Sequence, residues 1–217
     1  MNTNLSLVPS GFNPLSLGSK PQVRELHAGH RDDILTHFLH LNENDRRLRF
    51  GSPTSDAVIE RYVAKLNFNH DALLGVFDAN LDLIGLAHLA YLPQVHNTAR
   101  AAEFGVSVLP QGRHQGLGTA LLERAAMHCR NTRVQTLFVH CLANNKAMMH
   151  LANKLGMKVE FSYGDADAYL VLPPGNPSSI LAEAAQEHIA DFDYAIKANL
   201  KQSSETWRWL FGIPLWP

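Results

Sequence analysis

The segment that most constrains this chain is 103–122, which reads EFGVSVLPQGRHQGLGTALL. Its first part has the β-branched and aromatic residues of a strand, and its last part has the apolar spacing of an amphipathic helix. The turn between them contains Gly116 and Gly118, which lack the Cβ atoms that would keep an anion away from the backbone. A helix begins with unpaired N–H groups and the positive end of its dipole, and Arg113 adds a cation. The segment therefore predicts a pyrophosphate site.

Two common phosphate-binding loops do not fit this turn. A Walker loop carries Gly-Lys-Ser/Thr, whereas Gly118 is followed directly by Thr119. A dinucleotide-binding fingerprint needs a small residue three positions after its second glycine, where this chain has Leu121. Its strand also ends at Pro110, several residues before the glycines. The pattern that remains is Arg-x-x-Gly-x-Gly over 113–118, between a strand and a helix.

This pattern resembles the pyrophosphate loop of the GCN5-related N-acetyltransferases (GNAT), which holds acetyl-coenzyme A. Downstream, residues 143–157 (ANNKAMMHLANKLGM) resemble the asparagine-bearing helix of the same family. Residues 44–50 (NDRRLRF) and 102–104 (AEF) are similar to the acetyltransferase domain of bacterial Pat-type protein lysine acetyltransferases. The resemblance covers about residues 21–172.

The fold class expected from this resemblance is α+β, or mixed α/β. It implies a central, mostly antiparallel sheet of six to seven strands, splayed between strands 4 and 5 and flanked by helices. Hydrophobic periodicity predicts strands at 23–27, 73–77, 83–91, 99–109, 134–140, 159–161 and 168–172, and helices at 32–41, 55–66, 116–130 and 145–155. Gly105, inside one of these strands, is expected to mark a bulge or a close approach of a ligand.

Breakers and composition divide the chain into three parts. Residues 1–20 are rich in Ser, Asn, Gly and Pro and predict a flexible arm. The resemblance implies that residues 21–174 are an acetyltransferase domain. Residues 175–217 combine an amphipathic helix with a tail that contains all three tryptophans. We expect this tail to pack on its own domain, with a homodimer contact or a lid over the acceptor site as alternatives.

The resemblance implies acetyl-CoA as cosubstrate and assigns residues to it. Backbone N–H groups of the glycine loop would meet the pyrophosphate, the strand near Val106 and Val108 would pair with the pantetheine arm, and Asn145 would contact that arm from the other side. An N–H near Val106 would also meet the acetyl carbonyl oxygen. The candidate cofactor-binding residues are Val106, Ser107, Val108, Arg113, His114, Gln115, Gly116, Leu117, Gly118, Thr119, Asn145 and Met148.

Glu103 is the candidate catalytic residue. A protonated alkylamine is not a nucleophile, and a carboxylate in the cleft can take its proton directly or through water. The alternative is an ordinary strand glutamate that faces solvent. Many family members use a tyrosine as the general acid for the departing thiolate, but the matching position here is Ala152. Tyr163 and Tyr169 are possible substitutes, or rim aromatics.

Charge and residue counts exclude several other classes. A formal charge of −1 and a pI near 6.9 give no bulk attraction to nucleic acid or to an acidic membrane surface. No apolar run reaches membrane-spanning length, so we expect a cytoplasmic protein. Cys129 and Cys141 do not suggest a disulfide framework, and a nucleophilic Cys141 is the less favoured alternative. His37 and His40 invite a metal site, but they have no third ligand at a recognisable spacing, so no metal is expected.

Two functions stay open from the sequence. The favoured one is an N-acetyltransferase that moves an acetyl group from acetyl-CoA to a primary amine, either a protein lysine or a small molecule. The alternative is a non-catalytic acyl-CoA sensor. The missing tyrosine favours the sensor, and Glu103 counts against it.

Overall fold

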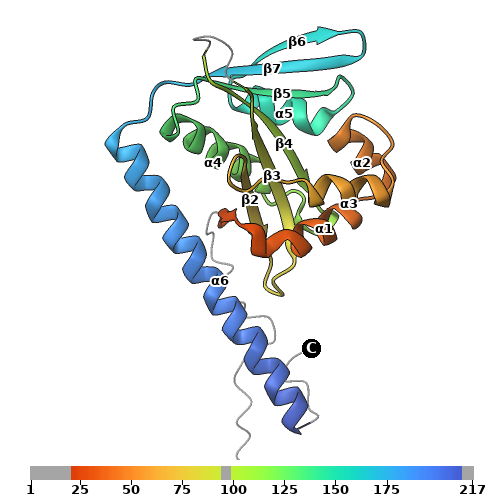
Figure 1. Cartoon of the computed structure of the whole chain (residues 1–217), viewed down its shortest axis with the longest axis vertical. Coiled ribbons are helices and arrows are strands. Elements are labelled where there is room, and N and C mark those ends of the chain that lie inside the picture. The colour runs from red at the N-terminus through yellow and green to blue at the C-terminus, as the bar shows by residue number, and fades with distance from the viewer. Residues whose placement is uncertain (1–20, 94–98, 212–217) are drawn as a thin grey trace, which may run out of the picture.

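The computed structural model describes residues 21–93 and 99–211, and these form a mixed α/β domain around a seven-stranded sheet (Figure 1). The strand order is β1-β2-β3-β4-β5-β7-β6. The strands are β1 (Arg24–Leu26), β2 (Ala72–Phe77), β3 (Leu83–Tyr91), β4 (Ala101–Val108), β5 (Thr136–Leu142), β6 (Lys158–Ser162) and β7 (Asp165–Val171). The helices are α1 (Arg31–Leu39), α2 (Glu43–Phe50), α3 (Asp56–Ala64), α4 (Leu117–Asn131), α5 (Lys146–Lys154) and α6 (Pro177–Phe211), with short 3₁₀ turns η1 (Ala28–His30) and η2 (Pro110–Gly112).

The sheet is antiparallel except between β4 and β5, which run parallel. These two strands pair only from Ala101 opposite Thr136 to Glu103 opposite Phe138. Beyond Glu103, β4 and β5 continue to their ends without pairing, so the sheet opens directly after this residue. The expected fold class and the expected splay between strands 4 and 5 are both confirmed.

Helices cover the sheet on both faces. Alternation along β2 sends Leu73 and Phe77 into a core with α1 and α3, and Leu74 and Val76 into the core that contains α4. All six residues of β2 are buried because both faces are covered. The sheet is less covered at its other end, where Tyr169 and Val171 on β7 are 37% and 79% exposed.

The bulge expected at Gly105 is wrong. The register of β3 with β4 runs without a shift from Gly85 opposite Val108 to Tyr91 opposite Ala102. The glycine instead makes room for a side chain of α2, because a Cβ at position 105 would lie 2.7 Å from Cζ of Arg49. Since no residue is inserted, alternation holds along β4, and Glu103 lies on the same face as Gly105.

Helix α2 was not predicted from the sequence. Asn42 caps its start, since the Asn42 side chain accepts a hydrogen bond from the Asp45 N–H at 2.9 Å. Gly51 ends the helix with φ of 76°, in the left-handed region that glycine adopts readily. Between the caps no residue is buried, so the segment has no apolar periodicity to detect.

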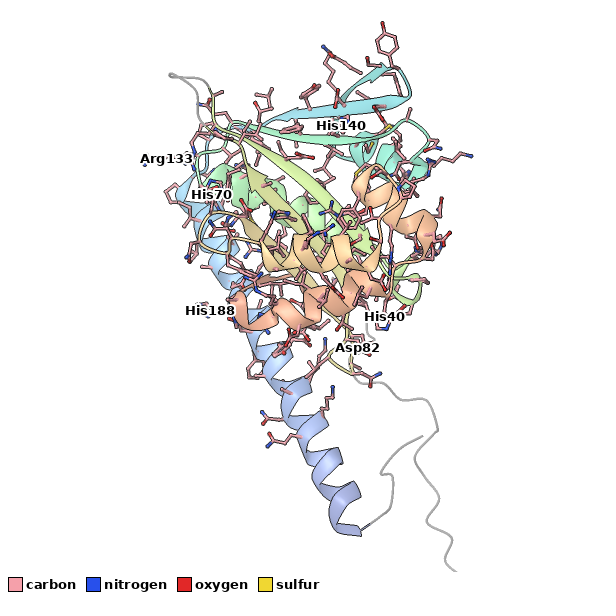
Figure 2. The ribbon with its side chains drawn as sticks, turned by 45° about the vertical axis from the view of Figure 1, so that its right-hand side comes forward. His40, His70, Asp82, Arg133, His140 and His188 are labelled. Carbon is pink, nitrogen blue, oxygen red and sulfur yellow. The ribbon has the colours of Figure 1, made fainter. Side chains whose placement is uncertain are left out.

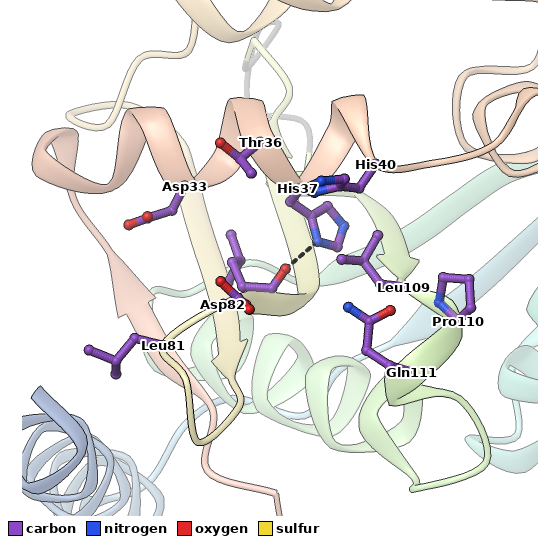
Figure 3. Close-up of a pocket in the computed structure, with 10 residues that line it drawn as sticks. Asp33, Thr36, His37, His40, Leu81, Asp82, Leu109, Pro110 and Gln111 are labelled. Atoms are coloured by element: carbon purple, nitrogen blue, oxygen red, sulfur yellow. Dashed lines mark hydrogen bonds between the residues drawn. The ribbon is translucent and has the colours of Figure 1, made fainter. Parts of the chain in front are cut away.

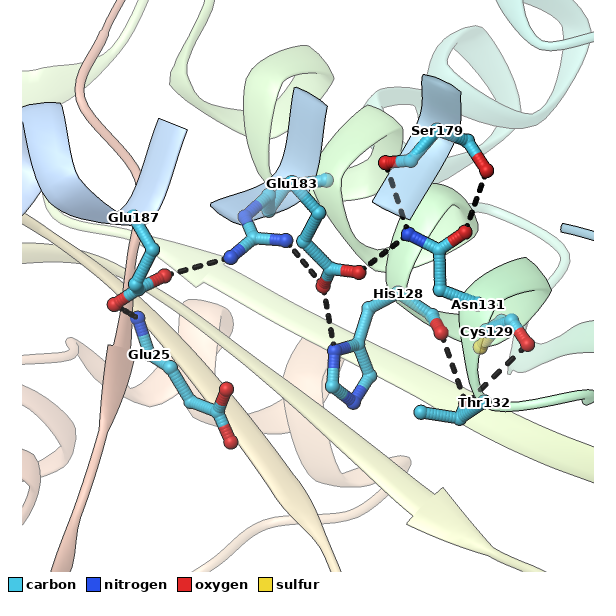
Figure 4. A network of polar contacts seen from close by, with 9 residues as sticks. Glu25, His128, Cys129, Asn131, Thr132, Ser179, Glu183 and Glu187 are labelled. Carbon is cyan, nitrogen blue, oxygen red and sulfur yellow. Dashed lines mark hydrogen bonds and ion pairs between the residues drawn. The ribbon is translucent and has the colours of Figure 1, made fainter. Parts of the chain in front are cut away.

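Helix α6 is much longer than the amphipathic pattern indicated, and its far half extends beyond the domain (Figure 1). Its near half is held by charges on α4 (Figure 4). The buried Arg124 donates to Glu183 and, at 2.6 Å, to Glu187. Burial alone would raise the pKa of Glu183, but hydrogen bonds from His128 and Asn131, together with Arg124, lower it to about 2. The carboxylate therefore stays ionised, and this part of α6 docks on its own domain.

Three predictions fall outside the described residues. These are the flexible arm at 1–20, and the lid and the dimer contact of the C-terminal tail, whose final residues are 212–217. They stay predictions, as do the domain limits. Within the described residues, no helix is both long enough and apolar enough to span a bilayer.

His37 of α1 gives the fold a pH dependence. It is 1% exposed and bridges two strands, since Nδ1–H donates to the Leu83 carbonyl at 2.7 Å and Nε2 accepts from the Ser107 hydroxyl at 2.8 Å. Burial, helped by the charges of Arg49 and His40, lowers its pKa from 6.5 to about 4. Between these two values the unfolded chain binds a proton that the folded chain does not, so stability rises with pH across this window and is lost as pH falls.

We therefore expect the contribution of His37 to the free energy of unfolding to fall by about 2 to 3 kcal/mol between pH 7 and pH 4.5. Urea unfolding of the wild type and of His37→Gln at both pH values measures it. The glutamine variant cannot take up this proton, so the stability gap between the two proteins should narrow at pH 4.5. A gap that is the same at both pH values would show that His37 is not the group responsible.

Candidate functional site

The loop before α4 forms a cradle of backbone donors. From His114 to Thr119, none of the six successive N–H groups has a hydrogen-bond acceptor among the described residues. His114 and Gly116 have φ of 61° and 77°, so the chain reverses here in left-handed conformations. Gly116 is the N-cap of α4 and offers no side-chain cap, and the first turn of this 15-residue helix contains no acidic residue. Such a set of free donors at a helix N-terminus can bind an anion.

Two cations lie beside the cradle, and one of them was missed. Arg113 pairs with Asp45 of α2 at 2.6 Å, so the predicted phosphate ligand also joins the loop to α2. Lys154, at the end of α5, places its Nζ 3.3 Å from Oγ1 of Thr119. Its sequence position, 35 residues after Thr119, gives no hint of this proximity. Lys154 is therefore a candidate phosphate neighbour that only the fold brings into place.

Gly118 also has a packing role. A Cβ at this position would come 3.2 Å from Cδ1 of Leu151, so the glycine lets the start of α4 approach α5 closely. The two functions of Gly118 are compatible, because the same missing side chain leaves its N–H accessible on the loop side.

The other predicted cofactor residues lie at the opening of the sheet. The edge of β4 that carries Val106 and Val108 is not paired with β5, as the predicted pantetheine contact requires. Ser107 is 8% exposed, and its hydroxyl is bound to His37. Asn145 caps α5 by accepting from the Met148 N–H at 3.1 Å, and both residues are buried. The side chains of Ser107, Asn145 and Met148 thus make contacts inside the domain, and their contact with a cofactor stays a prediction.

Glu103 lines an open pocket of about 500 Å³ where β4 and β5 begin to separate. The pocket takes side chains from β4, β5 and β7, and its walls are Leu92, Ala101, Glu103, Thr136, Phe138, His140, Asp167 and Tyr169. Because Glu103 is the last β4 residue paired with β5, its carboxylate lies at the point where the strands separate. A group held in the opening and a group in the pocket could therefore both reach it.

The three positions considered for a general acid, which would protonate the departing thiolate, differ in their burial and surroundings. Ala152 is fully buried and carries no proton to donate. Tyr163 is fully exposed in the turn between β6 and β7. Tyr169 lines the pocket and stacks on Phe138, with ring centroids 6.4 Å apart. Tyr169 is thus a rim aromatic of the pocket.

A polar network on α2, α3 and β3 was also missed. The guanidinium of Arg49 lies against the backbone at Gly105, and its Nη2 donates to the Tyr62 hydroxyl at 3.3 Å. Tyr62 donates in turn to Nδ1 of His88 at 2.7 Å, and His88 Nε2–H donates to Asp71 at 3.1 Å. Burial and the charge of Arg49 lower the pKa of His88, so it stays neutral. The network fixes Arg49 at the β4 side of the opening.

The alternative nucleophile and the metal site gain no support. Burial raises the pKa of Cys141 to about 11, with the carboxylates of Asp167 and Asp165 adding to the shift, and burial raises the pKa of Cys129 to about 12. Both thiols therefore stay protonated near neutral pH. Within the part of the chain that the structure describes, no three His, Cys, Asp or Glu side chains gather as metal ligands.

A second cavity of about 410 Å³ lies between α1, the β2–β3 turn and η2 (Figure 3). Asp33, His40, Asp82 and Gln111 line it, and the buried His37 contacts its wall. It lies near Leu109, six residues along the chain from Glu103, which is about 20 Å in an extended strand. The cavity is therefore separate from the pocket that Glu103 lines.

Known proteins resemble this chain in sequence and in fold. A model of the acetyltransferase (GNAT) family matches residues 37–157. The spermidine N(1)-acetyltransferase of Vibrio cholerae serotype O1 is 27% identical over 147 residues, which are 66% of this chain and 82% of that protein.

Solved structures give the same fold at lower identity. The GNAT domain of S. lividans PAT superposes with a TM-score of 0.59 and 18% identity, over 69% of this chain and 89% of that chain. The Vibrio cholerae spermidine N-acetyltransferase, in complex with CoA and spermine, gives a TM-score of 0.53 and 23% identity, over 69% and 94%. At these identities the structural likeness establishes the fold alone.

Proposed function

Because the chain belongs to the GNAT acetyltransferase family and is thus an acyltransferase, we propose that it moves an acetyl group from acetyl-CoA to a primary amine. The reaction is a direct attack in a ternary complex. The observation that carries this proposal is that one stretch of chain holds Glu103, the β4 edge beyond it that does not pair with β5, and the free N–H groups at 114–119. This stretch offers a binding site for a pyrophosphate at one end and a carboxylate at the other.

In this proposal the backbone N–H groups of the cradle bind the pyrophosphate, with Arg113 and Lys154 beside it. The pantetheine arm follows the edge of β4, and an N–H near Val106 meets the carbonyl oxygen as negative charge develops on it. Glu103 takes a proton from the attacking amine. Since free thiols have a pKa near ~8.5, the coenzyme thiolate can leave without a dedicated acid at position 152.

The acceptor is proposed only as a primary amine that can enter the open pocket of Glu103. The Pat resemblance of 44–50 and 102–104 favours protein lysines. The similarity to a spermidine acetyltransferase favours a small polyamine. Both acceptors present an alkylammonium group, and the exposed face around Tyr169 leaves room for either to approach.

Coenzyme binding is tested by thermal unfolding with and without acetyl-CoA. A ligand at ~100 times its dissociation constant stabilises the folded state by about 2.7 kcal/mol, which in a domain of this size raises Tm by several degrees. The dephosphorylated, adenine-free fragment acetyl-pantetheine serves as the control, because it lacks the pyrophosphate and should give a much smaller shift. If saturating acetyl-CoA leaves Tm unchanged, both the transferase and the sensor are wrong.

A further inference from the structure

We propose that His140, oriented by Asp167, is a second catalytic base that takes the first proton from the acceptor's ammonium group and releases it to solvent. This inference rests on the proposed function and adds a residue to its site. Neither side chain was singled out for the reaction in the sequence, because the two lie on different strands and 27 residues apart.

The strand register places His140 on β5, across the opening from the β4 edge along which the pantetheine arm is proposed to lie. The parallel pairing of β4 and β5 ends with Glu103 opposite Phe138. Two residues further along each strand, Gly105 and His140 stand on the two sides of the opening and on the same face as Glu103 and Phe138. His140 and Glu103 line the same pocket, so one amine can lie within reach of both.

Asp167 fixes how the imidazole is presented. His140 and Asp167 are directly opposite each other on β5 and β7, and Nδ1 of His140 lies 2.7 Å from Oδ1 of Asp167. A carboxylate only accepts, so Nδ1 carries the proton in this bond and Nε2 is left with its lone pair. Nε2 has no partner among the described residues, and the side chain of His140 is 54% exposed. The free nitrogen can therefore exchange a proton with both pocket and solvent.

The acceptor nitrogen loses two protons in the reaction, so a second base can take part. An acceptor nitrogen enters as R–NH₃⁺ and leaves as an amide N–H, so it loses two protons. The first must leave before the N–C bond can form. The second leaves the tetrahedral adduct as the C–S bond breaks, and the departing thiolate can accept a proton. Glu103 can pass that second proton to the sulfur, while His140 takes the first and gives it to water.

The charges around His140 suit this role. The hydrogen bond to Asp167 is the largest influence on the pKa of His140 and raises it. Burial, the second largest, lowers it, and the charges of Asp167, Asp165 and Glu103 raise it further. A base whose pKa lies closer to neutral pH accepts a proton from an ammonium ion more readily. His140 lies on the β5–β7 side of the molecule, and His188 on α6 lies far from it (Figure 2). This second histidine is exposed and outside the site, so His188→Ala is a matched control.

The test is the pH dependence of kcat/KM for amine-dependent thiol release by the full chain. In the wild type we expect kcat/KM to fall on the acid side with a midpoint above pH 6.5, where His140 becomes protonated. His140→Ala should lower kcat/KM about 10²-fold, and added imidazole should restore part of the rate. In Asp167→Asn the midpoint should move to lower pH, because the bond that raises the pKa of His140 is weakened. His188→Ala should match the wild type throughout.

Two failures can be told apart. If the wild type turns over but His140→Ala has the same kcat/KM and the same fall in kcat/KM at acid pH, the proposal of a second base is wrong. The proposed transferase activity is then unaffected. A loss in His140→Ala that imidazole does not restore, together with an unmoved midpoint in Asp167→Asn, also overturns the proposal of a second base. If the wild type releases no thiol with any amine, the proposed function fails, and this inference fails with it.

Discussion

Replacing Glu103 with glutamine is expected to lower kcat about 10²- to 10⁴-fold, the range that a positioned general base contributes. Glutamine has the same shape but cannot accept the amine proton. The side chain has no hydrogen-bond partner among the described residues and lines an open pocket, so the substitution should change the free energy of unfolding by no more than about 0.5 kcal/mol. The loss should therefore appear in turnover and not in folding or in coenzyme binding.

Steady-state thiol release at saturating acetyl-CoA and amine measures this loss. Glu123→Gln is the matched control, because Glu123 is an exposed carboxylate on α4. It removes the same charge from the same domain, and Glu123 does not line the pocket. Equal turnover of Glu103→Gln and the wild type would remove Glu103 from the mechanism.

Replacing Thr119 with glutamate is expected to weaken coenzyme binding about 100-fold. A carboxylate in the first turn of α4 is favourable for the helix itself, so the fold should not suffer. The same charge placed about 4 to 5 Å from a pyrophosphate costs about 3 kcal/mol at the effective dielectric of a protein surface. It would also attract the nearby Lys154, whose Nζ already contacts Thr119.

Titration calorimetry with acetyl-CoA gives the dissociation constants. Thr119→Gln is the neutral counterpart of nearly the same size, and it should bind within a few-fold of the wild type. Without coenzyme, the glutamate variant should unfold at a temperature no lower than that of the glutamine variant. Equal affinity of the two variants would mean that the pyrophosphate does not lie at the start of α4.

The sequence was sufficient for the parts of the site that are local in the chain. The strand, loop and helix of 103–122 needed only periodicity and two glycines, and the structure has all three as predicted. Gly116 also adopts a left-handed conformation, which glycine reaches without strain. Apart from α2, the order of helices and strands could be predicted in the same way, because apolar periodicity reports burial on one face of an element.

The parts that depend on the meeting of distant segments could not be predicted. Arg49 fills the space over Gly105, so a glycine that suggested a bulge in fact accommodates a side chain from a polar helix with no apolar signal. Lys154 contacts Thr119 where α4 and α5 pack closely at Gly118. His140 meets Asp167 through the register of β5 with β7, which no local pattern specifies.

The most direct test of the account is the release of coenzyme thiol from acetyl-CoA against a panel of amines that includes spermidine, lysine-containing peptides and simple monoamines. We predict release that requires both the protein and at least one of these amines, with one acetylated amine detected by mass spectrometry for each thiol. If acetyl-CoA stabilises the protein but thiol release with every amine equals the rate of hydrolysis without amine, the transferase account is contradicted, and the chain is a sensor of acyl-CoA.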